Sequence, residues 1–207
     1  MMKKINTTVF LLTLAVPALA VAAGEIEIHG VVEAGAQTVN VNGNNKAKFN
    51  EYSDIQDGFI GSFQFDALKD SYFLEAEGNN LGLDDQSLDL EGGRYGDFKY
   101  KFYYDKMPHN YSSHALSFYQ GLGTNRLVLP VDPTEAWRTS TDTWTTFDYE
   151  VQHKKYGGEI SMSFQSPFFF TIGAEQREQD GTRPYSVRQN IEVPNPIDYK
   201  TDNLNIK

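Results

Sequence analysis

Three observations in the sequence predict an all-β chain that folds as an antiparallel transmembrane β-barrel. Apolar and polar side chains alternate with period two along most of the chain after residue 24. Gly-containing turn signals such as Asp57-Gly58 and Asp180-Gly181 separate the alternating segments. The apolar positions are rich in Phe and Tyr, whereas the polar positions are dominated by Glu and Asp. Strands of this kind are typical of a barrel wall with lipid on one face and a polar lumen on the other.

The first 23 residues have the pattern of a secretory signal peptide. Lys3 and Lys4 precede a short apolar stretch at 7–16, and Pro17 leads into small residues at which cleavage is expected. The apolar stretch is too short to cross a bilayer as a helix. Removal of residues 1–23 takes away two lysines and no acid, so the net charge falls from −10 to −12.

The remaining chain contains eight alternating segments and a ninth stretch that is expected to pair with the eighth. A hairpin turn is expected at Asp180-Gly181, and Pro194 and Pro196 are expected to end the ninth stretch. The expected strands cover 25–37, 59–66, 72–79, 87–91, 98–105, 146–152, 159–164, 168–175 and 183–191.

The predicted connections alternate between long and short only in the first half of the chain. The connection at 40–57 is long and the connection at 67–71 is short, as in barrels with long external loops and short periplasmic turns. The segment 106–142 is predicted to be a long loop, a plug or an unrecognised strand. The connections predicted at 153–157 and 166–167 are both short, which leaves the strand direction after residue 105 open.

The residues after 193 predict that the barrel is incomplete. Residues 194–207 are polar and read as a loop or a truncated end, without the terminal aromatic that usually closes a bacterial barrel. The predicted organisation is therefore a signal peptide at 1–23, barrel strands and loops at 24–193, and a polar end at 194–207. We expect the chain to be the N-terminal part of a larger barrel.

Composition excludes several classes of protein. An acidic exported chain lacks the basic surface that binds nucleic acid. The sequence has no cysteine, so no disulfide framework, thiolate zinc site or covalently attached c-type haem is expected on this chain. Aromatic residues make up 14% of the sequence, which argues against disorder.

Several stretches resemble the MtrB/PioB-type outer-membrane β-barrels that are associated with decahaem c-type cytochromes. The most specific stretch is LDDQS at 83–87 followed by LEGGRYGDFKY at 90–100 and YDKMPHNY at 104–111. FNEYSD at 49–54, WTTFDY at 144–149 and YGG at 156–158 follow the same pattern. The resemblance covers about residues 49–185. Some members carry a Cys-x-x-Cys motif near the mature N-terminus, which is absent here, so no thiol-dependent role is expected.

The resemblance implies a structural role in the outer membrane of a Gram-negative bacterium. Family members are large barrels that enclose a periplasmic multihaem (decahaem) c-type cytochrome, so that electrons cross the outer membrane inside a porin-like sheath. The implied partners are that cytochrome, an extracellular cytochrome as a further candidate, and outer-membrane lipid. The resemblance implies no enzyme activity and no cofactor on this chain.

Catalytic and metal sites find little support in the sequence. Asp105, His109 and His114 could form an acid/base group with Ser112 or Ser113, but no nucleophile-elbow pattern is present. The four histidines, which include His29 and His153, have no metal-ligand spacing. Asp84, Asp85, Asp89 and Glu91 do not match a calcium loop. We expect no catalytic, cofactor-binding or metal-binding residue.

The predicted functional feature is an acidic wall. Glu75, Glu77, Asp89 and Glu91 occupy polar positions on two strands that are expected to pair. Such a wall in the lumen would disfavour anions or contact a basic patch of a cytochrome, although ordinary solvation of a lumen explains the same pattern.

Three other functions remain open from the sequence alone. A general porin or small outer-membrane barrel would lack the cytochrome. A secreted β-sandwich could bind glycans through exposed Tyr and through Trp137 or Trp144. An outer-membrane hydrolase lacks a convincing triad.

Overall fold

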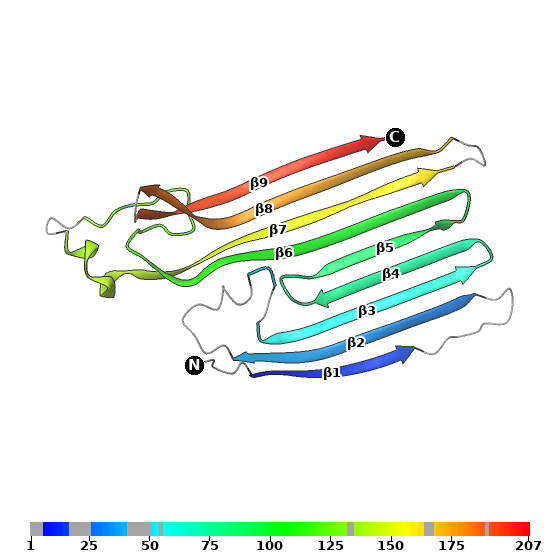
Figure 1. The fold of residues 1–207 in the computed structure, drawn as a ribbon, viewed down its shortest axis with the longest axis horizontal. Helices are drawn as coiled ribbons and strands as arrows, with labels where there is room; N and C mark the ends of the chain where they lie inside the picture. Colours follow the sequence, from blue (N-terminus) through cyan, green and yellow to red (C-terminus); the bar gives the residue numbers. More distant parts are fainter. Residues whose placement is uncertain are drawn as a thin grey trace.

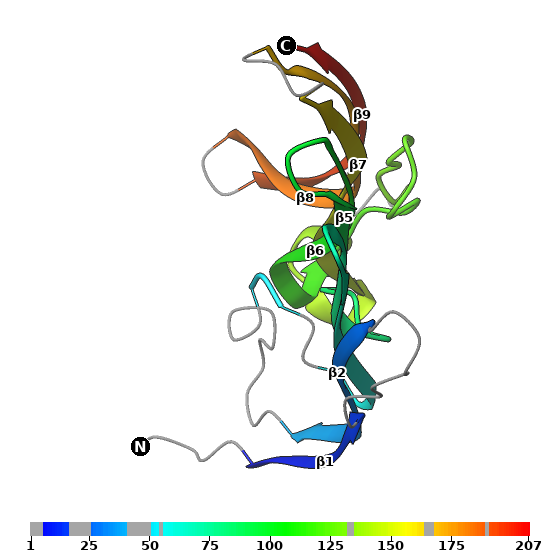
Figure 2. The same cartoon turned by 90° about the vertical axis from the view of Figure 1, so that its right-hand side faces the viewer.

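The structure is a computed structural model in which nine strands form one antiparallel sheet, with each strand paired to the next in sequence. It describes residues 6–16, 26–40, 51–53, 56–131, 135–163, 168–188 and 191–207, the first range by its backbone alone. Figures 1 and 2 show a single curved layer. The strands are β1 Asn6–Val16, β2 Glu27–Asn40, β3 Gly58–Lys69, β4 Tyr72–Leu81, β5 Ser87–Arg94, β6 Phe98–Ser117, β7 Thr145–Met162, β8 Phe170–Arg188 and β9 Ile191–Ile206.

Strand pairing places the alternating residues in rows that run across the sheet. Tyr100 of β6 pairs with Ile160 of β7, and this row continues through Ile172 of β8 to Ile206 of β9. The next row, on the opposite face, runs from Lys101 through Glu159. We call these two sides the apolar face and the polar face. The predicted period-two alternation is thus confirmed.

Within the residues that the structure describes, the apolar face is not packed against a second sheet. Ile160 is 38% exposed, Ile172 40% and Leu204 70%. A β-sandwich would bury such residues against its other sheet. All strands of the described residues belong to one sheet, so the sandwich alternative does not hold.

The apolar face carries a band of apolar residues with a sharp edge in β6 and β7, and the band ends one row earlier in β8 and β9, at Ala174 and Leu204. The last row of this apolar band contains Tyr104 and Tyr156, and the row beyond it contains Lys106 and Lys154. On β3 the apolar residues extend further, to Phe59, which is 82% exposed. The edge therefore runs obliquely to the strands, as expected where strands cross a bilayer with a tilt of about 35–45°.

Glycines inside strands accept aromatic rings from the neighbouring strand. Gly157 and Gly158 were predicted to form a turn, but they lie within β7, opposite Tyr103 and Phe102. A Cβ on Gly158 would lie 2.6 Å from a Phe102 ring carbon, and one on Gly157 would lie 2.7 Å from Tyr103 Oη. These glycines are thus required by close packing and not by a turn.

Strand β7 is one continuous element where the sequence predicted two. It covers both predicted strands at 146–152 and 159–164 up to Met162, so the predicted short connection at 153–157 is wrong. The turn predicted at Gly92-Gly93 is also displaced, because β5 continues to Arg94 and the turn follows it.

The predicted hairpin at Asp180-Gly181 is wrong, because β8 continues through it to Arg188. Gly181 has a φ of 137° and lies so close to the β7 backbone that a Cβ would overlap it, which explains why glycine occurs here within a strand.

The predicted loop at 194–207 is also wrong, because these residues form most of β9. Pro194 and Pro196 lie within this strand, opposite Pro184 and Thr182. Proline is tolerated there because β9 pairs on one side only within the described residues, so a missing N–H can face away from the ladder. The alternative prediction of a truncated end stays a prediction.

The segment 106–142 begins as a strand. β6 continues to Ser117 because β7 pairs with it as far as Thr145, and Pro108 is fully buried within β6. The connection to β7 is therefore 118–144, with two 3-10 helices at Ala136–Arg138 and Thr141–Thr143. We call the end of the sheet that carries this connection the long-connection end.

The structure pairs Asn6–Val16 with β2, within the segment that the sequence predicts to be a signal peptide. The cleavage of residues 1–23 stays a prediction. The turn signal at Asn42-Gly43 lies outside the described residues. No helix in the described part of the chain has the length and apolar character needed to span a membrane.

Candidate functional site

The four predicted acids lie together on the polar face. Glu75 pairs directly with Glu91, and Glu77 pairs directly with Asp89. Asp66 of β3 extends the group because it pairs with Glu75. These acids line a shallow hollow of about 500 Å³. We call Glu75, Glu77, Asp89 and Glu91 the acidic wall.

Two lysines of β6 neutralise part of the acidic wall. Lys99 forms an ion pair with Glu91, and Lys101 Nζ lies 3.5 Å from Asp89 Oδ1. The ion pairs among the described residues leave Glu75 without a basic partner. Like charges directly opposite each other destabilise a sheet. The acidic wall therefore destabilises the folded sheet.

A second charged group on the polar face is centred on Glu175 of β8. Tyr103 Oη donates a hydrogen bond of 2.7 Å to Glu175, and Arg177 Nε donates one of 2.6 Å. Lys155 Nζ lies 3.6 Å from the same carboxylate and 5.0 Å from the centre of the Tyr103 ring. The sequence did not predict this group, because Lys155 falls in the connection predicted at 153–157, away from any predicted strand.

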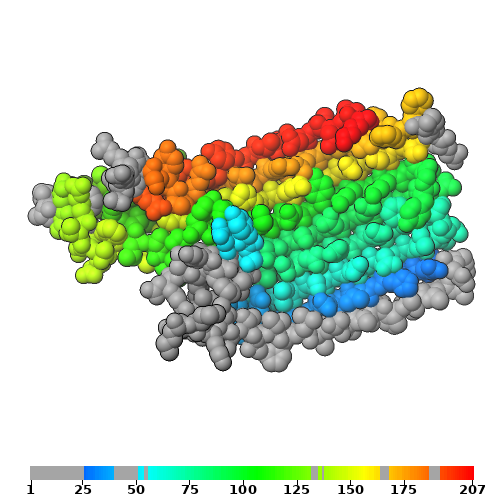
Figure 3. All heavy atoms as spheres, in the orientation of Figure 1, coloured from blue at the N-terminus to red at the C-terminus, as the bar shows by residue number. Residues whose placement is uncertain are grey.

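The candidate acid/base residues are not brought together. His109 stacks between Tyr52 and Tyr111, with ring centres 4.4 Å and 3.9 Å away, and its Nε2 lies 3.4 Å from Glu51 Oε1. The segment 51–53 thus lies across β6 (Figure 3). His114 lies beyond a register shift, and its backbone N–H donates to Asp148 instead. Within the described residues no three His, Asp or Glu side chains converge as metal ligands do.

His153 lies next to this stack on the polar face, beyond the apolar band. It pairs with Met107, which is three residues past Tyr104 on β6. Burial lowers the pKa of His153 below its ordinary value of 6.5, and the nearby charge of His109 lowers it further. The folded chain therefore favours the neutral imidazole of His153.

We expect the lowered pKa of His153 to make the protein less stable in acid. As the pH falls through 6.5, the unfolded state takes up a proton that the folded state resists, so the free energy of unfolding decreases. His153→Gln should reduce the change in urea midpoint between about pH 7.5 and pH 5. His29→Gln, at an exposed position on β2, is the control and should keep the wild-type change. An unaltered pH dependence in His153→Gln would contradict the expectation.

The fold and the two faces define a class of protein. Strands with an apolar band on one face and ionised side chains on the other are those of an outer-membrane β-barrel. The sequence matches the profile of a family described as "Putative outer membrane beta-barrel porin, MtrB/PioB" over residues 41–207. The chain belongs to this family and is a protein of the outer membrane of a Gram-negative bacterium.

A curated relative supports this assignment. The chain is similar to the outer membrane protein MtrB of Shewanella baltica (strain OS185), with 23% identity over 141 residues. The match covers 64% of this chain and 20% of that protein, so the chain spans about a fifth of the length of its relative.

Proposed function

We propose that this chain forms part of the wall of an outer-membrane barrel that encloses a multihaem c-type cytochrome. In this role the apolar face meets lipid and the polar face lines the lumen. The observation that carries the proposal is the acidic wall, where carboxylates lie directly opposite one another on the polar face and two lysines neutralise only part of their charge. The barrel would hold the redox protein, and it would carry no catalytic residue of its own.

A wide lumen is needed for this function, and the exposure of the polar face supports one. In an eight-stranded barrel, inward side chains fill the interior. Here the inward candidates Glu75, Glu77 and Asp89 are exposed, with no packing layer over them in the described residues. Carboxylates that face open space can meet the basic surface of a soluble partner. The haem would belong to that partner, because this sequence has no cysteine to attach it.

A periplasmic decahaem cytochrome is the proposed occupant, and an extracellular cytochrome is a further candidate partner at the end that faces the medium. In outer-membrane barrels the longer loops face the exterior. By this rule the long-connection end, with the connection 118–144, faces the medium. The polar lumen would insulate the cytochrome from lipid, which does not tolerate haem propionates.

Co-purification tests the proposal. The full-length protein, tagged and extracted from outer membranes in mild detergent, should retain a protein that stains for covalent haem. A colourless preparation that conducts ions in planar bilayers would overturn the cytochrome role and leave a general porin.

Neutralisation of the acidic wall should weaken retention of the cytochrome. The variant carries Glu75→Gln, Glu77→Gln, Asp89→Asn and Glu91→Gln. Exposed ion pairs contribute about 0.2–1 kcal/mol each, so we expect binding to weaken about tenfold. The salt concentration that elutes the haem protein from the immobilised barrel should fall. Because like charges are removed, thermal stability should stay the same or increase.

A matched variant separates this effect from a general loss of charge. Glu178→Gln, Asp180→Asn, Asp198→Asn and Asp202→Asn remove four acids from the rows that continue the apolar face. Retention of the cytochrome should be unchanged in this control. Equal losses in both variants would contradict a specific role of the acidic wall.

A further inference from the structure

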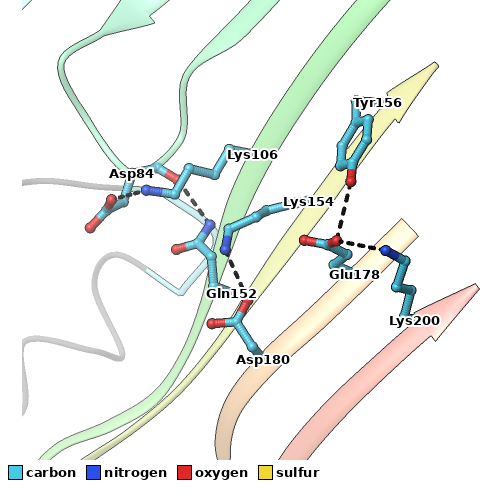
Figure 4. A network of polar contacts seen from close by, with 8 residues as sticks. All are labelled: Asp84, Lys106, Gln152, Lys154, Tyr156, Glu178, Asp180 and Lys200. Atoms are coloured by element: carbon cyan, nitrogen blue, oxygen red, sulfur yellow. Dashed lines mark hydrogen bonds and ion pairs between the residues drawn. The ribbon is translucent and has the colours of Figure 1, made fainter. Parts of the chain in front are cut away.

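A row of lysines lies beyond the apolar band on the same face. Lys106 of β6 pairs with Lys154 of β7, which pairs with Glu178 of β8, which in turn pairs with Lys200 of β9. Three of the four positions in this row thus carry an ammonium group. Figure 4 shows these side chains along the neighbouring strands, with Tyr156 beside them. We call Lys106, Lys154 and Lys200 the lysine row.

Lys106 and Lys154 lie at the depth of lipid headgroups, and Lys200 lies further out, two rows beyond Leu204, the last residue of the apolar band in β9. The first two lysines are one row, or two residues, beyond Tyr104 and Tyr156, which is about 7 Å along a strand. Tyrosines at the end of an apolar band mark the boundary between hydrocarbon and headgroups. The headgroup region on each side of a bilayer is about 5–8 Å thick. The ammonium groups of Lys106 and Lys154 therefore project from the lipid-facing side of the barrel wall where lipid phosphates lie, and Lys200 flanks them on the outer side.

Each lysine is held by one carboxylate and keeps further donors. Lys106 forms an ion pair with Asp84, Lys154 Nζ lies 3.0 Å from Asp180 Oδ1, and Lys200 Nζ lies 3.8 Å from Glu178 Oε1. An ammonium group has three N–H donors, so one ion pair does not exhaust it. The side chains of Lys154 and Lys200 are 31% and 55% exposed, which leaves these donors accessible from the bilayer side.

The neighbouring acids limit what kind of attraction is available. Asp180 and Asp198 lie in the row beyond the lysine row, and Asp202 lies in the row of the tyrosines. Carboxylates outnumber ammonium groups on this surface, so its net charge is negative and a diffuse positive field cannot hold an anion here. Directed hydrogen bonds from the ammonium groups to phosphate oxygens can, because charge-assisted bonds of this type are short and strong.

We propose that Lys106, Lys154 and Lys200 form a binding site for the phosphate groups of membrane lipids at the long-connection edge of the apolar band. The site would fix the depth of the barrel wall in the bilayer, and it would retain anionic lipids around β6–β9. This inference rests on the place of the barrel in the outer membrane and not on the cytochrome role proposed above, so failure of one leaves the other intact.

Native mass spectrometry of the full-length protein with added phosphatidylglycerol tests the proposal. The variant Lys106→Gln/Lys154→Gln/Lys200→Gln should bind phosphatidylglycerol about tenfold more weakly than wild type. The control Lys99→Gln/Lys101→Gln/Lys155→Gln removes the same charge from the polar face and should bind as wild type does. Equal affinity in wild type and in the lysine-row variant would overturn the proposal.

Two further measurements keep the test decisive. If the triple variant does not fold, Lys200→Gln alone changes the most exposed lysine of the row and should weaken binding about threefold, whereas wild-type affinity would overturn the proposal. Inorganic phosphate at millimolar concentration should leave the bound phosphatidylglycerol in place. Its displacement would show a site for soluble phosphate and not for lipid.

Discussion

An arginine in place of Ile160 is expected to destabilise the barrel by about 2–4 kcal/mol, the cost measured for a cation on the lipid face near the bilayer centre. Ile160 lies in the row with Tyr100 and Ile172, inside the apolar band, and is 38% exposed. Among the described strands, no acidic residue shares that row to pair with the guanidinium. Urea unfolding in lipid vesicles, followed by tryptophan fluorescence, measures the loss.

The neighbouring residue provides the control for this experiment. Glu159 lies next to Ile160 in β7 but on the polar face, where it is exposed opposite Lys101. Glu159→Arg should cost less than about 1 kcal/mol, the range for like charges across a sheet. Equal losses at the two positions would contradict the assignment of the faces.

The second large effect is expected from Gly158→Val. A Cβ at Gly158 would lie 2.6 Å from the Phe102 ring and 3.0 Å from the Lys101 carbonyl oxygen, so either the ring or the strand must move. Overpacking of this kind costs roughly 1–3 kcal/mol. The folded fraction, measured from heat-modifiable mobility on SDS gels, should fall accordingly.

Gly58→Val is the matched control for Gly158→Val. Gly58 begins β3, and an added Cβ there meets no atom within 4 Å. The substitution should leave the folded fraction unchanged or raise it slightly, because valine favours strands. If Gly158→Val folded as well as Gly58→Val, the aromatic packing over Gly158 would not be needed for folding.

The acidic wall could be predicted because its strands are short, regular and joined by a close turn. Glu75 and Glu77 occupy alternate positions of β4, and Asp89 and Glu91 do so in β5. The turn between these strands leaves adjacent pairing as the simplest arrangement. The sequence placed the four acids on one face, and the structure added that they pair with like charge directly opposite.

The Glu175 group and the lysine row could not be predicted in the same way. Both depend on the partners of Lys154 and Lys155, which the sequence predicts to lie in a short connection at 153–157. A glycine pair at a turn and a glycine pair under aromatic rings have the same sequence. Only the neighbouring strand, with Tyr103 and Phe102 in register, distinguishes the two.

The sequence by itself determined the class of fold, the two faces and the family, because period-two alternation is a local property of an extended chain. The tertiary structure decided where the strands end and which charges meet. In the sequence, the prolines of β9, the glycines of β7 and Gly181 of β8 all predict a turn or the end of a strand. In the structure, each lies within a strand. Pairing with a neighbouring strand supplies the hydrogen bonds and the ring contacts that override these local signals, and pairing is a non-local property that no segment contains alone.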